Sequence, residues 1–247
     1  MDVSTFVLIH GGWHAAWCWV RVIPLLEKHG HRVIAPDLPG HGANAMPVCE
    51  RPYELYVPEV CALLDGLEER AILVGHSSGG MIIGEAGRRM SKRASGLVYL
   101  SAFLLPAGKT PRDVMKMDSE SLLAGSLEID DTRGVSYVRK ECAKRVFYDD
   151  CSDQDAAWAI SQLQPEPLIR QGPAVSDARS DEPPSVRTPR FFIECLHDRA
   201  LSPVVQRWMY TESPCDAVYS LSTSHSPFLS APAALAQHLL DIDRRIL

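Results

Sequence analysis

Residues 71–83 read A-I-L-V-G-H-S-S-G-G-M-I-I, and this stretch decides the predicted fold. Four apolar residues that run into a glycine are typical of a strand buried on both faces of a sheet. Residues 80–90 then predict a helix, because an apolar run continues into two arginines without a helix breaker. Ser77 therefore lies in a tight turn between a strand and a helix, with a glycine two residues away on either side.

The turn at Ser77 gives this serine the setting of a nucleophile. A strand-to-helix turn strains the backbone at its centre, and glycines at positions 75 and 79 relieve the crowding. The hydroxyl group then projects at the carboxyl end of the sheet, where a base can reach it. The Ser78 N–H, at a helix N-terminus, points toward developing negative charge. The simpler alternative is a glycine-rich turn that joins a strand to a helix.

The rest of the sequence alternates between strand and helix patterns. Strands are predicted at residues 6–10, 31–36, 96–102, 190–196 and 217–221, and helices at 15–29, 53–70, 202–211 and 231–246. Pro24 predicts a loop or a first helical turn near it. The alternation predicts an α/β fold, with a mostly parallel sheet and helices on both faces.

This alternation stops between residues 105 and 186. The segment is richer in charge and proline, and short amphipathic helices are predicted at 111–127, 139–148 and 152–163. Its apolar residues are too many for a disordered linker. We therefore predict an α/β core made of residues 1–104 and 187–247, with residues 105–186 inserted as a helical cap.

Composition excludes several classes of function. The 247 residues carry a net charge of −6 without a basic run, which argues against nucleic-acid binding. Apolar runs are too short to span a membrane. The first strand begins by Thr5, which leaves no room for a signal peptide, and seven cysteines lack C-x-x-C pairing, so reduced thiols and a cytoplasmic location are expected. The sequence offers no metal motif and implies no cofactor, and it leaves a homodimer open.

Three polar residues follow three predicted strands: Ser77, Asp198 and His225. The carboxyl ends of parallel strands share one edge of a sheet, so these side chains converge there. A serine hydroxyl needs an imidazole to take its proton, and the imidazole needs a carboxylate to orient it. The order Ser, Asp, His is the one that this architecture uses. The alternatives are a helix N-terminal acid for Asp198 and a surface loop residue for His225.

An oxyanion needs two donors, and the sequence offers both. One is the Ser78 N–H. The other is assigned to the Gly12 N–H, because Gly11-Gly12 follow the first strand and let the backbone approach a substrate closely. A simple tight turn is the alternative. Among the other histidines, His76 is expected to pack beside the nucleophile. Surface or loop positions are expected for four more: His31, His41, His197 and His238.

The chain resembles the α/β-hydrolase superfamily over nearly its whole length and, within it, the plant methylesterase and hydroxynitrile lyase group with its bacterial esterase relatives. The matching text is F-V-L-I-H-G-G-W-H-A-A-W-C-W at 6–19, L-L-E-K-H-G-H-R-V-I-A-P-D-L-P-G-H-G at 25–42, I-L-V-G-H-S-S-G-G, L-V-Y-L-S-A-F at 97–103 and S-H-S-P-F at 224–228. The resemblance implies a helical cap over an apolar pocket. It also implies that Gly12 donates to the oxyanion, in agreement with the assignment above.

Two positions depart from the lyase pattern. Hydroxynitrile lyases place a lysine directly after the catalytic histidine and a threonine after the first strand's histidine, where this chain has Ser226 and Gly11. The lysine supplies positive charge for cyanide, so the lyase function loses its key group. The resemblance also includes hormone receptors that keep the triad, and cyclases or lactonases.

The sequence thus predicts a cofactor-free serine hydrolase that acts on a small to medium apolar ester, lactone or related acyl compound. Ser77 is acylated, His225 acts as base and then acid, and Asp198 orients it. The alternatives are a ligand-binding receptor with a vestigial triad, and a lyase or cyclase. Candidate pocket walls, with ordinary core packing as the alternative, are Trp13, Phe103, Leu104, Trp158 and Phe228.

Overall fold

Six parallel strands form the central sheet of the computed structural model, which describes residues 3–44, 55–168 and 187–246. The strand order is β2-β1-β3-β4-β8-β9, and each neighbouring pair is parallel. The predicted α/β fold is confirmed. The strands are β1 (Thr5–Ile9), β2 (Arg32–Ile34), β3 (Ala71–His76), β4 (Ala94–Leu100), β8 (Arg190–Cys195) and β9 (Ala217–Leu221).

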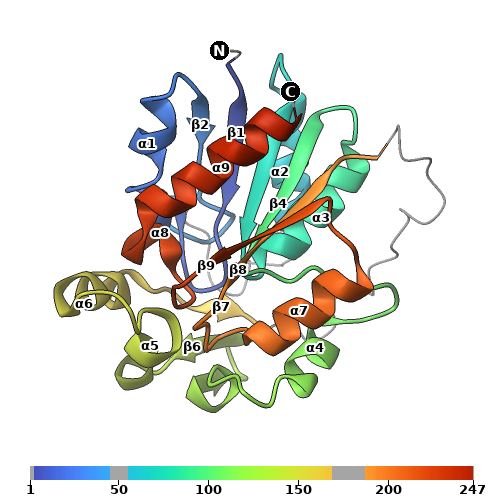
Figure 1. Ribbon diagram of the computed structural model, residues 1–247. Helices are drawn as coiled ribbons and strands as arrows, with labels where there is room; N and C mark the ends of the chain where they lie inside the picture. The colour runs from blue at the N-terminus through green and yellow to red at the C-terminus, as the bar shows by residue number, and fades with distance from the viewer. Residues whose placement is uncertain (1–2, 45–54, 169–186, 247) are drawn as a thin grey trace.

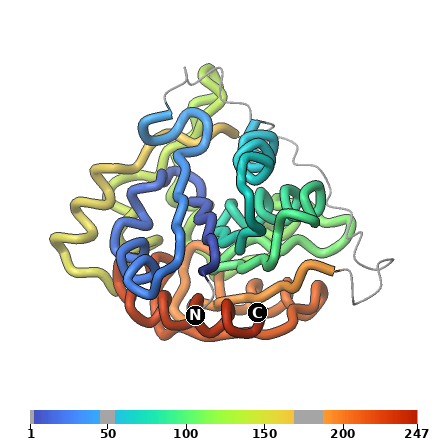
Figure 2. The backbone as a smooth tube through the Cα atoms, turned by 90° about the horizontal axis from the view of Figure 1, so that it is seen from above, coloured from blue at the N-terminus to red at the C-terminus, as the bar shows by residue number. Residues whose placement is uncertain are grey.

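Helices cover both faces of the sheet, because successive strand residues point to opposite faces. In β1, Phe6 and Leu8 pack into one layer, whereas Val7 and Ile9 pack into the other. Figure 2 shows α9, in red, on the opposite side of the sheet from α2 and α3, in cyan and green. The first layer holds η1 (Ala16–Trp19), α1 (Ile23–Glu27), α8 (Pro227–Ser230) and α9 (Pro232–Ile246), and the second holds α2 (Tyr56–Asp65), α3 (Gly79–Arg89) and α7 (Pro203–Glu212).

The helix predicted at residues 15–29 is divided into η1 and α1. Pro24 lies in the first turn of α1, where its missing N–H breaks no helical hydrogen bond. Gly30 follows α1 with a φ of +88°, a conformation that favours glycine. The division therefore follows from the proline, as its position predicted.

The described residues between β4 and β8 form a cap at the carboxyl ends of the sheet strands (Figure 1). Its helices are α4 (Pro111–Met117), α5 (Lys140–Phe147) and α6 (Asp153–Gln162). Thr110 begins α4 by forming a capping box with Asp113. The helix predicted at 111–127 is too long, because the chain turns through η4 (Ala124–Ser126) into a strand.

The cap also contains a three-stranded antiparallel sheet that the sequence did not predict. It consists of β5 (Leu127–Asp130), β6 (Val135–Val138) and β7 (Glu166–Pro167), in that order. Gly134, with a φ of +67°, supplies the turn between β5 and β6. Strands this short leave little alternating pattern to detect. The cap boundaries at 105 and 186 stay predictions, and residues 169–186 lie outside the described part.

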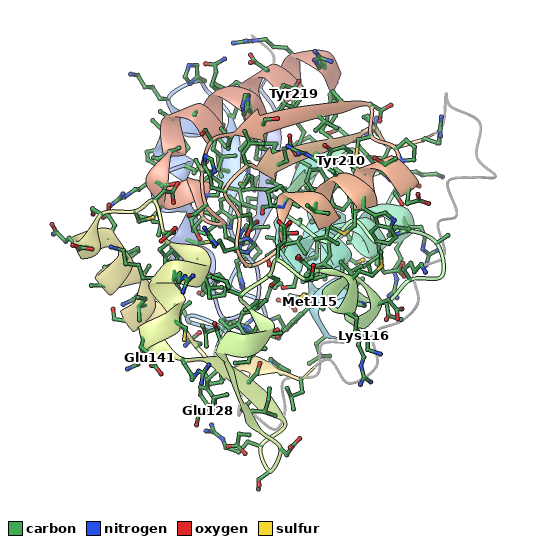
Figure 3. The ribbon with its side chains drawn as sticks, turned by 60° about the horizontal axis from the view of Figure 1, so that its bottom comes forward. Met115, Lys116, Glu128, Glu141, Tyr210 and Tyr219 are labelled. Atoms are coloured by element: carbon green, nitrogen blue, oxygen red, sulfur yellow. The ribbon has the colours of Figure 1, made fainter. Side chains whose placement is uncertain are left out.

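The cap lies away from the amino end of β1 and the carboxyl end of α9 (Figure 1). Figure 3 brings this end of the molecule forward and marks Glu128 and Glu141 on the cap, with Tyr210 and Tyr219 on the core elements α7 and β9. In the ranges that the structure describes, no helix combines the length and the apolar character that a membrane crossing requires.

Candidate active site

Ser77 lies between β3 and α3 in the strained turn that the sequence predicts. Its φ is +53°, a left-handed conformation that costs a non-glycine residue free energy. Glycine is required at both flanking positions because backbone atoms pack closely against them. A Cβ on Gly75 would lie 2.6 Å from the Gly79 carbonyl oxygen, and a Cβ on Gly79 would lie 2.8 Å from the His10 carbonyl oxygen. Backbone packing therefore fixes the turn that presents the Ser77 hydroxyl.

Asp198 and His225 form a buried pair beyond the ends of β8 and β9. His225 Nδ1 lies 2.7 Å from Asp198 Oδ2, and both side chains are almost completely buried. The other carboxylate oxygen, Oδ1, accepts the Ala200 N–H at 2.7 Å and the Leu201 N–H at 3.0 Å. The carboxylate holds the proton of His225 on Nδ1, which leaves Nε2 free to accept one.

Two further polar side chains support the acid, and sequence reasoning missed both. Ser101, at the end of β4, donates its hydroxyl to Asp198 Oδ2, and its φ is +44°. Gln206, on α7, donates Nε2–H to the same oxygen at 3.0 Å. The sequence signal that could have found Ser101 is a polar residue at the end of a predicted strand. Asp198 therefore accepts five hydrogen bonds, which fix it firmly.

His225 is held beside the turn of Ser77 by the neighbouring His76. His76 Nε2 donates to the His225 carbonyl oxygen at 2.9 Å, and the two rings lie 4.5 Å apart between centroids. Within the described part of the chain, Ser77 Oγ and His225 Nε2 share no hydrogen bond. Such contacts in free enzymes often tighten only when substrate binds. The structure thus brings the three predicted catalytic residues to one edge of the sheet.

The turn after β1 packs directly against the turn of Ser77. A Cβ on Gly11 would lie 2.8 Å from the Ser77 Cβ. The Gly11 carbonyl accepts His10 Nδ1–H at 2.9 Å, and the Gly12 carbonyl accepts His14 Nδ1–H at 2.8 Å. The Gly12 and Ser78 N–H groups, in contrast, have no acceptor among the described residues. Two free backbone donors at adjoining turns suit a developing oxyanion.

Burial keeps three histidines around the pair neutral. It lowers the pKa of His10 to about 4 and the pKa of His14 to about 3, and it takes the pKa of His76 well below its usual value. His14 also accepts the Tyr148 hydroxyl at Nε2, at 2.8 Å, which fits its proton lying on Nδ1. These side chains therefore act as neutral hydrogen-bonding groups, and His225 is the imidazole beside Ser77 that has a carboxylate partner.

The cap contacts the site from the far side. The Phe147 ring lies 5.6 Å from the His225 ring and 5.9 Å from the Trp13 ring. Asp150 accepts the Ser224 N–H at 3.0 Å, immediately before His225. These contacts fix the histidine loop against α5 and the residues that follow it.

The predicted pocket residues do not form one group. Trp13 is half-buried against Phe147, and the Phe103 N–H donates to the Ser77 carbonyl at 3.0 Å, so both adjoin the site. Leu104 is buried in the layer of α2 and α3. Phe228 packs fully buried against His76. Trp158, on α6, is 39% exposed and packs edge-on against Trp17 of the core element η1. Their roles as pocket walls stay predictions.

Two histidines expected at the surface or in loops are buried. His41 is 1% exposed, because the loop after β2 folds beneath the cap, and His31 packs edge-on against Phe6. His41 Nε2 lies 2.9 Å from the carboxylate of Glu166 in β7. Contacts between segments this distant leave no pattern in the sequence. Among the described residues, no group of three or more His, Cys, Asp or Glu side chains is placed to hold a metal.

Comparisons with known proteins show what the whole chain is similar to. A model of the alpha/beta hydrolase family matches residues 6–238. Methylesterase 1 of Arabidopsis thaliana is 32% identical over 96% of this chain and 95% of its own. A pyrethroid hydrolase of Sphingobium wenxiniae is 33% identical over 98% of this chain and 88% of its own. The crystal structure of a pyrethroid hydrolase from Sphingobium faniae superimposes with a TM-score of 0.82 at 31% identity, covering 98% of this chain and 97% of that one.

Proposed function

The chain belongs to the alpha/beta hydrolase family and is a carboxylic-ester hydrolase, and from this premise we propose that it forms an acyl-enzyme on Ser77. The proposed substrate is a small to medium apolar ester, lactone or related acyl compound, and no cofactor takes part. Relatives named as methylesterases and as a pyrethroid hydrolase support an ester as the bond that is cleaved. We further propose a cytoplasmic protein that binds neither nucleic acid nor membrane, and leave a homodimer open.

The proposed reaction starts with proton transfer from Ser77 to His225 Nε2 as the hydroxyl attacks the carbonyl carbon. Asp198 keeps His225 in the required tautomer and stabilises the imidazolium that forms. The Gly12 and Ser78 N–H groups donate hydrogen bonds to the carbonyl oxygen as it becomes negatively charged. Collapse of this intermediate breaks the bond to the leaving alcohol, which takes the proton from His225. Water then repeats the sequence on the acyl-enzyme and releases the acid.

One observation carries this proposal. The buried 2.7 Å contact between His225 Nδ1 and Asp198 Oδ2 lies beside a serine whose φ is +53°. A structural serine in a strand-to-helix turn gains nothing from that strain, whereas a nucleophile gains an exposed hydroxyl. An orienting carboxylate likewise matters most to an imidazole that exchanges protons.

The test is turnover of a series of p-nitrophenyl esters of increasing acyl length. We expect clear turnover with a chain-length optimum, and its loss in Ser77→Ala. Ser222→Ala is a matched control, because this serine lies on the histidine loop but is exposed and bonds to His197. Binding of the same esters without turnover would indicate a receptor and overturn the proposal. Turnover by Ser77→Ala equal to that of the wild-type protein would contradict an acyl-enzyme on Ser77.

A further inference from the structure

Glu166 brings a carboxylate from the cap to the turn that follows β1. It is 5% exposed, and its Oε2 accepts the Trp13 N–H at 3.0 Å. The same oxygen lies 2.9 Å from His41 Nε2, which donates its N–H there. None of the steps of ester hydrolysis uses Glu166 or His41. A buried carboxylate costs free energy unless it is well bonded, so its place here calls for a physical explanation.

The Trp13 N–H belongs to the peptide group directly after Gly12. The carbonyl of that same peptide, on Gly12, accepts His14 Nδ1–H at 2.8 Å. Glu166 and His14 therefore hold the two ends of one peptide plane. Since glycine has no side chain to restrict it, the orientation of Gly12 depends on such external bonds.

The backbone polar groups of this turn show a pattern. The Gly11 carbonyl, the Gly12 carbonyl and the Trp13 N–H are each hydrogen-bonded. Between them, the Gly12 N–H has no acceptor in the ranges that the structure describes. Trp13 also has a φ of +62°, an unfavourable conformation that its bond to Glu166 helps to hold. The bonds on either side of the Gly12 N–H therefore leave this donor free.

We propose that Glu166 is a positioning residue for the oxyanion hole. Anchored by His41, its carboxylate holds the Gly12–Trp13 peptide, so that the Gly12 N–H faces the site of the Ser77 reaction. This inference rests on the proposed function, because it assigns a role within the hole which that function requires. Donors stabilise a transition state when they are oriented before the reaction begins. The cap then contributes to catalysis as well as covering the site.

The hydrogen bond, rather than the charge, carries this role. A negative charge near a developing oxyanion is unfavourable, so the benefit must come from the accepted N–H. Because one oxygen accepts both bonds, the amide oxygen of Glu166→Gln can replace it. Glu166→Asp keeps the charge but is shorter by one C–C bond, about 1.5 Å, which takes its oxygens out of hydrogen-bond reach. Glu166→Met keeps the volume and removes the acceptor.

The test compares these three variants on one p-nitrophenyl ester that the wild-type protein cleaves. We expect Glu166→Gln to retain kcat and KM within threefold. Glu166→Met and Glu166→Asp should lose at least tenfold in kcat, with KM within threefold. Gln164→Ala is the matched control, since its side chain bonds the Gly42 N–H at 2.7 Å from the same cap segment. It should retain kcat within twofold.

A second measurement reports on the oxyanion hole itself. A trifluoromethyl ketone forms a hemiketal oxyanion on Ser77, whereas the corresponding secondary alcohol does not. In Glu166→Met and Glu166→Asp, the inhibition constant of the ketone should rise at least tenfold and that of the alcohol should stay within threefold. A change in both constants would indicate a general structural role.

Several outcomes would overturn this inference. Wild-type kcat in Glu166→Met and Glu166→Asp would show that the turn needs no bond to the cap. A loss in Glu166→Gln equal to that in Glu166→Met would assign the effect to charge or packing. If Glu166→Met does not fold, the comparison of the Asp and Gln variants decides. Absence of turnover in the wild-type protein would instead contradict the proposed function. The experiment therefore distinguishes a failure of the proposed function from a failure of the role assigned to Glu166.

Discussion

Replacing Asp198 with asparagine should disable the proposed base while leaving the nucleophile and the oxyanion hole in place. Oδ1 accepts two backbone N–H groups, from Ala200 and Leu201, so the amide oxygen of asparagine must take that position. The NH₂ group then replaces Oδ2, which now lies 2.7 Å from His225 Nδ1. An NH₂ group donates to an unprotonated Nδ1, which places the imidazole proton on Nε2. His225 in that tautomer has no lone pair for the Ser77 proton.

The orientation that the two backbone N–H groups impose on asparagine has a cost in stability. Gln206 Oε1 accepts the Cys195 N–H at 3.2 Å, and its Nε2 donates to the Leu201 carbonyl at 2.6 Å. Gln206 therefore keeps its own NH₂ group facing the position of Oδ2, and the amide of Asp198→Asn meets another donor there. A buried donor without an acceptor costs about 1–3 kcal/mol, so the free energy of unfolding should fall by that order.

The kinetic loss should be large. A wrong imidazole tautomer in a serine hydrolase reduces kcat by up to about 10⁴-fold, which corresponds to roughly 5.4 kcal/mol of transition-state stabilisation. The assay is kcat and KM on a p-nitrophenyl ester, with KM expected within threefold of wild type. Asp216→Asn is the matched control, because Asp216 precedes β9 and accepts the Arg190 N–H at 2.7 Å. A loss below tenfold in Asp198→Asn would refute the reasoning and indicate another orienting carboxylate.

Four further predictions follow from the site. Ser101→Ala removes one donor from the catalytic carboxylate and should lower kcat about tenfold at constant KM, measured on the same ester. Gly12→Val crowds the turn, and disturbing one oxyanion donor should cost roughly 3 kcal/mol of transition-state stabilisation; unchanged kcat in a folded variant would move the hole elsewhere. Burial lowers the pKa of His14 to about 3 in the folded protein. In the unfolded chain this histidine takes up a proton near pH 6.5, whereas in the folded protein it stays neutral down to about pH 3. The contribution of His14 to the free energy of unfolding is therefore complete above pH 6.5, and it falls by up to about 1.4 kcal/mol per pH unit from there toward pH 3. Urea unfolding at pH 7.5 and 5.0 measures this change. Equal stability at the two pH values would contradict the prediction. Ser226 is neutral where hydroxynitrile lyases place a lysine, so mandelonitrile should release cyanide no faster than in buffer; Ser77-dependent release above ester turnover would reverse the assignment.

The sequence predicted the parts of the molecule that depend on local pattern. The six core strands and the turn of Ser77 follow from short apolar runs and from glycine spacing. Asp198 and His225 could be assigned because each follows a strand, and parallel strands end at one edge. Glu194, in contrast, lies inside β8 and accepts hydrogen bonds from Arg207 and Ser220.

The contacts that adjust the site could not be predicted in this way. Ser101 reaches Asp198 because its backbone turns out of β4 with a positive φ, which no spacing rule indicates. Glu166 and His41 are 125 residues apart, and their pairing depends on how the cap settles on the core. The small cap sheet has strands too short to show alternation. Long-range packing determines each of these features, and a single sequence records only its local consequences.

The proposed acyl-enzyme on Ser77 is tested most directly by covalent capture. A p-nitrophenyl alkylphosphonate mimics the tetrahedral intermediate and leaves a stable adduct on the attacking oxygen. Intact-mass measurement should show one adduct, and peptide mapping should place it on the side-chain oxygen of Ser77. No adduct should form in Ser77→Ala. Labelling of Ser78 or Ser101 at an equal rate, or an undiminished adduct in Ser77→Ala, would contradict the account.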